Sequence, residues 1–208
     1  MYSMSNGTVF IVDDDTSFLR ALSRSLRAGG YEVESFESGE ALLGRLSPDV
    51  TGCVVADLRM PGLNGLELQS ALAKTSNPLP VVFLSGEGDI PTTVQAMRNG
   101  AEDFLTKTAP REQVIAAIQR AMERDVQSRQ QRERRASLQQ RFEALTPREI
   151  EVLRYVVSGR LNKQIAAELG INERTVKLHR TNLTRRLGVQ SVAELTRLVG
   201  EAELFPKD

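Results

Sequence analysis

The sequence predicts an α/β domain, with a five-stranded parallel sheet covered by helices on both faces, and then an all-α domain. Five short apolar runs alternate with helical patterns in the N-terminal half, which is typical of a parallel sheet. From Phe142 onward the apolar spacing is helical throughout. The charge divides too: residues 1–126 hold 11 Lys/Arg and 17 Asp/Glu, a net of −6, and residues 127–208 hold 16 and 10, a net of +6. Two domains with different partners are therefore expected.

The N-terminal strands and helices follow from the spacing of apolar residues. A strand is expected where a short apolar run ends at a polar residue, and a helix where apolar residues recur three and four apart. The predicted strands are 9–12, 31–36, 53–56, 81–84 and 103–106. The predicted helices lie around 18–26, 40–46, 66–73, 92–99 and 114–122.

A polar segment separates the two domains. Residues 127–140 are rich in Gln, Arg, Glu and Ala, which are good helix formers. We predict a helical linker over 125–141 that can continue the fifth helix, between domains at 7–124 and 142–208. The linker carries no apolar heptad, which argues against a coiled coil.

The C-terminal domain begins with a strong helix start at Thr146-Pro147-Arg148-Glu149. A second helix is expected from about Asn162, and a tight turn at 170–172 leads into a third helix over 173–187. Two helices joined by such a turn form the helix-turn-helix of DNA readers, whose second helix enters the major groove.

The predicted helix 173–187 has two unlike faces. Val176, Leu183 and Leu187 fall on one line and are expected to face the core. The opposite face carries Arg174, Leu178, Thr181 and Arg185, with Lys177 and Asn182 on its flanks. A basic face with an exposed leucine suits phosphates and thymine methyl groups.

Polar residues follow four of the predicted strands. Asp13-Asp14, Asp57, Ser85 and Lys107 come directly after strands one, three, four and five. In a parallel sheet they share one edge, where such sheets bind ligands. Clustered carboxylates need a hard cation such as Mg²⁺. The cation would keep Asp57 ionised as a nucleophile, Lys107 could pair with a phosphoryl oxygen, and Ser85 could donate a hydrogen bond to it.

These residues resemble the receiver domain of two-component response regulators, which has a flavodoxin-like fold. The matching pieces are Val12-Asp13-Asp14, Asp57 to Gly62 with Gly65, Ser85-Gly86 and Lys107. The resemblance implies that Asp57 accepts phosphate from a histidine kinase. It implies Mg²⁺ (Mn²⁺ can substitute) on Asp14, Asp57 and the main-chain carbonyl of Arg59, with Asp13 helping through water. It also makes Ser85 and Phe104 a switch pair and the surface around helix four and strand five a dimer face.

The second half resembles the LuxR-type DNA-binding domain, and the whole chain the NarL/FixJ subfamily. The matching pieces are 146–149, 162–166, Thr175-Val176-Lys177 with His179, and 187–189. The resemblance implies a promoter-binding transcription regulator that forms a homodimer on phosphorylation and contacts the transcription machinery. Bases would be read by Lys177, Leu178 and Thr181, and phosphates would be nearer Asn162, Lys163, Thr175, His179 and Arg180. Arg174 joins this set from the outward face.

One position departs from the receiver pattern. Thr108 follows Lys107 where the family usually has a proline, often in a cis peptide bond. Because a non-proline cis bond costs ~2.5–4 kcal/mol, a trans bond and a differently shaped loop are expected.

Two other functions compete with a phosphorylation-switched regulator. Asp13-x-Asp15 at a strand end resembles Mg²⁺-dependent aspartyl phosphatases, but that reading leaves Asp57, Ser85 and the basic half without a role. A receiver that is never phosphorylated is the second alternative, supported by Thr108. We therefore expect no turnover of an external substrate. With no membrane-spanning run and no signal peptide, a cytoplasmic bacterial protein without membrane partners is expected.

Overall fold

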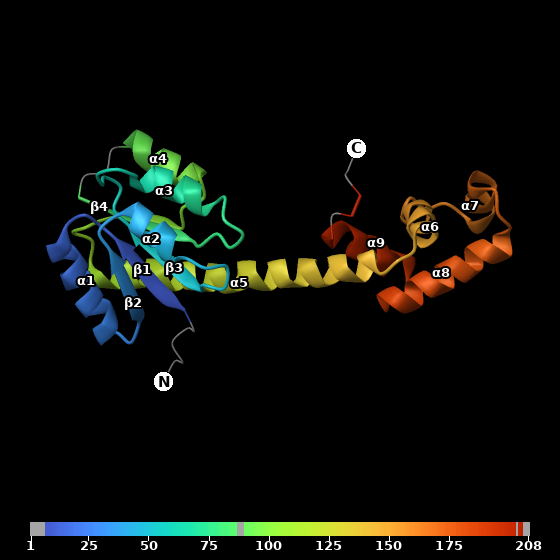
Figure 1. Cartoon of the computed structure of the whole chain (residues 1–208), viewed down its shortest axis with the longest axis horizontal. Helices are drawn as coiled ribbons and strands as arrows, with labels where there is room; N and C mark the ends of the chain where they lie inside the picture. Colours follow the sequence, from blue (N-terminus) through green and yellow to red (C-terminus); the bar gives the residue numbers. More distant parts are fainter. Residues whose placement is uncertain (1–6, 87–89, 203, 206–208) are drawn as a thin grey trace. The chain divides into compact units, whose positions relative to one another are not determined.

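The computed structural model describes residues 7–86, 90–202 and 204–205. The chain forms two compact units, residues 1–129 and 130–208 (Figure 1). Each unit has its own core, and each is described by itself below. No helix among the described residues is long and apolar enough to cross a bilayer.

The N-terminal unit alternates strands with helices, as predicted. Its elements are β1 (Thr8–Val12), α1 (Thr16–Ala28), β2 (Glu32–Phe36), α2 (Gly39–Arg45), β3 (Gly52–Ala56), α3 (Gly65–Leu72), β4 (Val81–Ser85), α4 (Ile90–Arg98), β5 (Asp103–Thr106) and the first part of α5 (Arg111–Glu143). The described strands form one sheet in the order β2-β1-β3-β4-β5 with every pairing parallel. The prediction of a parallel five-stranded sheet is therefore confirmed.

Helices cover both faces of this sheet, because consecutive strand residues point to opposite faces. On one face, Val9 and Ile11 pack with Leu19 of α1 and Ile118 of α5. On the other face, apolar residues of the same strands pack with α2, α3 and α4. The buried members of that second cluster include Phe10, Val12, Leu42, Val54, Leu68, Phe83 and Ala96.

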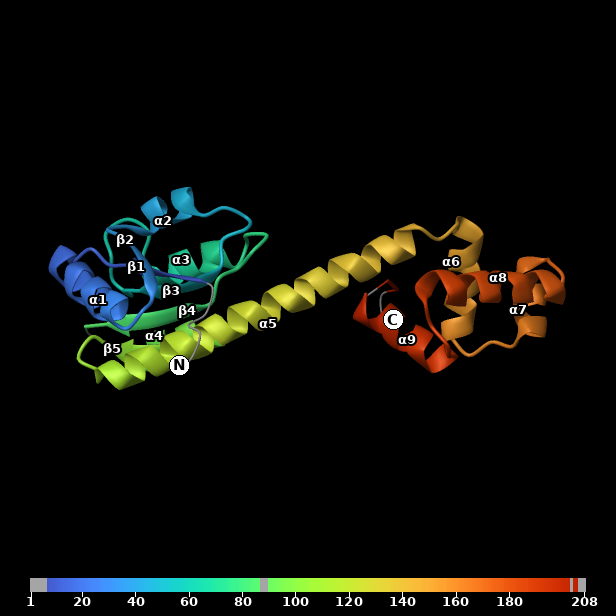
Figure 2. The same cartoon turned by 90° about the horizontal axis from the view of Figure 1, so that it is seen from below.

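Helix α5 is one unbroken helix that contains both the predicted fifth helix and the predicted linker (Figure 2). The sequence did not indicate how its polar stretch packs. Asp125, within that stretch, is buried in the N-terminal unit and accepts hydrogen bonds from Gly52 N–H (3.0 Å) and Arg129 Nε (3.1 Å). Near the other end, Leu138 and Phe142 belong to the core of the C-terminal unit. Each end of α5 is thus held by a different core.

The C-terminal unit adds α6 (Pro147–Val157), α7 (Asn162–Leu169), α8 (Glu173–Leu187) and α9 (Val192–Glu201). Thr146 and Glu149 form the predicted capping box at the start of α6. Gly170 ends α7 with a φ of 63°, a left-handed conformation that a glycine adopts without strain, and this permits the tight turn into α8. Arg148 donates a hydrogen bond to the Leu169 carbonyl (2.8 Å), which fixes the end of α7 against α6.

Candidate functional site

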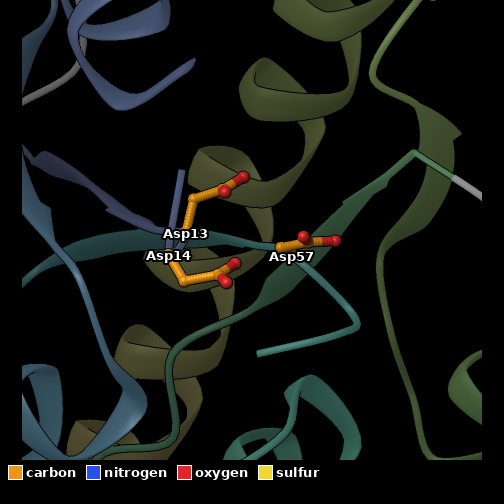
Figure 3. A group of neighbouring side chains, drawn as sticks. All are labelled: Asp13, Asp14 and Asp57. Carbon is orange, nitrogen blue, oxygen red and sulfur yellow. The ribbon is translucent and has the colours of Figure 1, made fainter. Parts of the chain in front are cut away.

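Three carboxylates meet at the carboxyl edge of the sheet. The register pairs Val12 of β1 with Ala56 of β3, so the residues that follow them, Asp13 and Asp57, leave the sheet at the same level. Oxygen atoms of Asp13, Asp14 and Asp57 lie within 4.8 Å of one another, and Figure 3 shows the three side chains gathered at the strand ends. Asp13 and Asp57 are buried, whereas Asp14 is exposed. The convergence expected from a parallel sheet is thus present, with one side open to solvent.

Lys107 supplies the positive charge of this cluster. Its backbone N–H donates to the Ser85 carbonyl (2.9 Å), which places the lysine beside the ends of β4 and β5. Its Nζ atom lies 2.7 Å from Asp13 Oδ2 and 2.9 Å from Asp57 Oδ2. Burial lowers the pKa of Lys107, but the hydrogen bonds to the two carboxylates more than offset burial and raise it above its usual value. The two carboxylates therefore favour the charged form of Lys107.

Burial and Lys107 act against each other on Asp13. Desolvation raises the pKa of its carboxyl group, and the hydrogen bonds from Lys107 and from the Asp15 backbone N–H lower it, with a net rise. Asp15 itself accepts from the N–H groups of Ser17 (2.9 Å) and Phe18 (3.1 Å) as the cap of α1. The third acid of the run is thus engaged in starting a helix.

The backbone around Asp57 is held closely. Asp57 Oδ1 accepts a hydrogen bond from Leu58 N–H (2.6 Å), while Oδ2 faces Lys107. A Cβ atom at Gly65 would lie 2.4 Å from the Asp57 carbonyl oxygen, so the start of α3 can approach this strand end only as glycine. The side chain of Arg59 is exposed on the loop between them.

Ser85 and Phe104 lie on neighbouring strands beside this cluster. Ser85 is buried at the end of β4. Phe104 on β5 is half-buried, and its ring centroid lies 5.9 Å from that of Phe83. Phe104 therefore packs on the core while part of it reaches the surface.

The loop after β5 carries a threonine where a proline was expected. No peptide bond among the described residues is cis, so the bond to Thr108 is trans, as predicted. The Thr108 hydroxyl lies 3.1 Å from that of Thr106. Sequence reasoning missed Phe18, which it placed only in the helical apolar pattern of α1; Lys107 Nζ lies 4.7 Å from the centroid of its ring.

In the C-terminal unit, α8 has the two faces that its sequence predicts. Val176, Leu183 and Leu187 are buried in the core. Leu178 is 58% exposed on the opposite side. A hollow lies between the start of α7 and α8, and its lining comprises Leu161, Asn162, Lys163, Glu173, Lys177, Arg180 and Thr181.

The predicted DNA-contact residues differ in their exposure to solvent and in their hydrogen-bond partners. Five of them are exposed: Lys163, Arg174, Lys177, Leu178 and Thr181. Thr175 and His179 are half-buried on the core flank of α8. Arg180 and Asn162 are engaged with each other, since Arg180 Nη1 donates to Asn162 Oδ1 over 2.7 Å. The structure therefore gathers part of the set around the hollow, where this pair links the two helices, whereas Arg174, Thr175, Leu178 and His179 lie outside its lining.

Comparison with known proteins assigns both units. Residues 9–119 match the family of response regulator receiver domains, and residues 143–199 match the bacterial regulatory proteins of the luxR family. The chain belongs to the response regulators with a LuxR-type DNA-binding domain.

Relatives of this response regulator match it over nearly their whole length. Nodulation protein W of Bradyrhizobium diazoefficiens is 43% identical over 190 residues, which cover 91% of this chain and 84% of that one. The transcriptional regulatory protein FixJ of Azorhizobium caulinodans is 36% identical over 200 residues, 96% and 95% of the two chains. The solved structure of the response regulator StyR shares 44% identity with a TM-score of 0.77, covering 94% of this chain and 98% of that one.

The family sets the general role of the protein. A response regulator of this kind is the partner of a histidine kinase in a two-component system, and its LuxR-type domain binds DNA to regulate transcription.

Proposed function

We propose that a histidine kinase phosphorylates Asp57, and that this controls dimerisation and sequence-specific DNA binding at promoters. The observation that carries the proposal is the contact of Lys107 Nζ with both Asp57 (2.9 Å) and Asp13 (2.7 Å) at the sheet edge. A nucleophilic carboxylate with two further acids suits metal-assisted phosphoryl transfer to an aspartate, and the ammonium group of Lys107 can pair with the phosphoryl group once it is attached.

The acidic cluster fits a divalent cation. Three carboxylates against one ammonium group leave a formal charge of −2, and all the available ligands are oxygens, which Mg²⁺ prefers. Asp14, Asp57 and the main-chain carbonyl of Arg59 would hold Mg²⁺, with Asp13 helping through water, and Mn²⁺ could take its place. The metal supplies shielding of the negative charges that must meet when phosphate approaches a carboxylate.

The chain's own residues perform the transfer. An Asp57 carboxylate oxygen attacks the phosphorus atom, the bond to the donor's imidazole nitrogen breaks, and Asp57 becomes an acyl phosphate. Lys107 then pairs with a phosphoryl oxygen, and the Ser85 hydroxyl donates a hydrogen bond to another. Water can later hydrolyse the acyl phosphate, so the regulator resets itself without acting on any external substrate.

The switch transmits this event to the surface. As Ser85 moves toward the phosphoryl group, Phe104 repacks inward beside Phe83, and the surface of α4 and β5 changes shape. That surface already exposes Ile90, Val94 and Met97 in the described part of α4. Their spacing of four and three residues makes one apolar stripe, which suits a second copy of the chain.

Paired DNA-binding units then engage two half-sites at once. We propose that Lys177, Leu178 and Thr181 face base edges. Phosphates lie nearer a second set: Asn162, Lys163, Arg174, Thr175, His179 and Arg180. Two sites bound together raise the affinity without any new contact. The bound dimer would then contact the transcription machinery. In this proposal the receiver spans 7–124, the linker 125–141 and the DNA-binding domain 142–208.

The test combines labelling, mass and DNA binding on the full chain. With Mg²⁺ and a small acyl phosphate, we expect one acid-labile phosphoryl group, a doubled mass by light scattering and tighter promoter binding. Asp57→Asn should abolish all three, whereas Asp49→Asn, an exposed acid of the same unit, should abolish none. Full labelling of Asp57→Asn would refute the assignment. Turnover of a phosphate ester would favour the aspartyl phosphatase instead.

A further inference from the structure

Helix α8 carries a single acidic residue, and it lies on the side proposed to face DNA. The helix reads ERTVKLHRTNLTRRL, so Glu173 is the one acid among five arginine and lysine residues. Glu173 is exposed and lines the same hollow as Lys177 and Thr181. Residues 173, 177 and 181 are four apart, which places them in one stripe along the helix.

An acidic side chain in this stripe is unfavourable for DNA binding unless it makes a specific contact. DNA carries about one negative charge per 1.7 Å of its axis, so an exposed carboxylate on the docking face weakens binding to any sequence. Among the described residues, the Glu173 side chain has no ion-pair or hydrogen-bond partner that would neutralise it. Glu173 lies in the first turn of α8, where the helix dipole favours its charge, but the capping hydrogen bond is made by Asn172, which accepts from Arg174 N–H (2.9 Å).

A carboxylate can still contact DNA favourably at an amino group of a base. In the major groove, cytosine offers N4–H₂ and adenine offers N6–H₂, whereas guanine and thymine present carbonyl oxygens at the same places. A carboxylate accepts a hydrogen bond from the amino groups and is repelled by the carbonyl oxygens. An acid in the stripe therefore trades general affinity for discrimination at one base pair.

We propose that Glu173 is a specificity-determining residue that accepts a hydrogen bond from the amino group of a base at one position of each half-site. The preferred base is cytosine. The inference rests on the proposed role of α8 as the reading helix. Lys177 donates and so suits the acceptors of guanine. Four residues rise about 6 Å along a helix, and stacked base pairs are ~3.4 Å apart, so the Glu173 position falls about two base pairs from the Lys177 position.

The experiment selects binding sites from a library with randomised half-sites, using the full chain with Mg²⁺ and a small acyl phosphate. Four proteins are compared: wild type, Glu173→Ala, Glu173→Gln and Glu168→Ala. Glu168 is an exposed acid on α7 outside the lining of the hollow, so the last variant matches the change in charge alone. The affinity of each protein is then measured for the selected site and for its single-base variants.

We expect the wild type to prefer cytosine over guanine or thymine at one position. Glu173→Ala should reduce that preference by about five- to one-hundred-fold and bind unrelated DNA more tightly. Glu173→Gln should move the preference toward adenine, which a glutamine recognises through N6 and N7. Glu168→Ala should keep the wild-type preference at every position.

Two results would overturn the inference while leaving α8 as the reading helix. In one, Glu173→Ala selects the wild-type motif at every position; in the other, it tightens all sequences equally, as loss of simple repulsion would. A different result concerns the proposed function itself. If the wild type selects no motif, α8 does not read bases and the inference fails with it.

Discussion

Lys107 Nζ lies 2.9 Å from Asp57 Oδ2, so the proposed acceptor carboxylate already has a fixed cation at one of its oxygens. The same ammonium group contacts Asp13 at 2.7 Å. Both carboxylates are buried, and Lys107 partly offsets the cost of keeping their charges away from water. A divalent cation placed in the cluster would therefore have to share these oxygens with Lys107.

The first prediction removes that cation. In Lys107→Met, Mg²⁺ should bind several-fold more tightly, because like charges no longer oppose each other at the site. The acyl phosphate should still form on Asp57, but the rise in mass should be lost, because the phosphoryl group lacks its partner. Calorimetric titration with Mg²⁺ and light scattering measure the two effects. Lys74→Met, at an exposed position, is the control; weaker Mg²⁺ binding by Lys107→Met would contradict the charge argument.

The second prediction separates base readers from phosphate contacts on α7 and α8. Lys177→Ala should reduce the ratio of specific to non-specific affinity, because a base contact carries sequence information. Lys163→Ala should weaken all sequences alike and reduce the slope of log affinity against log salt by about one. Binding titrations at several salt concentrations distinguish the two. An unchanged specificity ratio in Lys177→Ala would show that this residue does not face the bases.

The third prediction concerns the apolar stripe on α4. Ile90 is 81% exposed, and Ile90→Asp should keep the phosphorylated chain monomeric, because burying a carboxylate in an apolar interface costs several kcal/mol. Labelling of Asp57 should be unaffected. Val126→Asp, at an exposed apolar position on α5, should still form dimers. Light scattering with and without acyl phosphate measures the mass of each variant. If Ile90→Asp still forms dimers, the dimer interface does not include this stripe.

The fourth prediction uses the buried carboxylate of Glu149. Burial raises the pKa of this carboxyl, but hydrogen bonds from the Thr146 N–H and hydroxyl (2.9 Å each), with Arg186 and His179 nearby, bring it below its usual value of 4.5. The folded state thus favours the ionised form. Its contribution to the free energy of unfolding is complete above pH 4.5 and is lost as the pH falls through the lower folded pKa.

Glu149→Gln should remove this pH dependence and lower the free energy of unfolding of the C-terminal unit by about 1 kcal/mol at neutral pH, the usual value of a helix cap. Urea unfolding, monitored by circular dichroism at pH 7 and below pH 4.5, measures the free energy of unfolding at each pH. Glu151→Gln, an exposed acid on the same helix, should behave as wild type. Equal pH dependence in both variants would contradict the role given to Glu149.

The sequence by itself determined the parallel sheet, its flanking helices and the carboxyl-edge position of Asp13, Asp57 and Lys107. These features are local or follow from strand periodicity, because every parallel strand ends at the same edge. The two faces of α8 were likewise contained in its 3.6-residue period, and Leu178 is exposed as that period predicts.

Only the tertiary structure decided which side chains meet across elements. Asp125 reads as part of a polar linker, yet it is buried against the Gly52 N–H, which is 73 residues away in the chain. The sequence suggested that Arg180 and Asn162 each contact a phosphate independently. In the structure Arg180 donates a hydrogen bond to Asn162 over 2.7 Å. Phe18 reads as a core residue and lies over Lys107. Periodicity gives the face on which a side chain lies, but its partner depends on how separate elements pack.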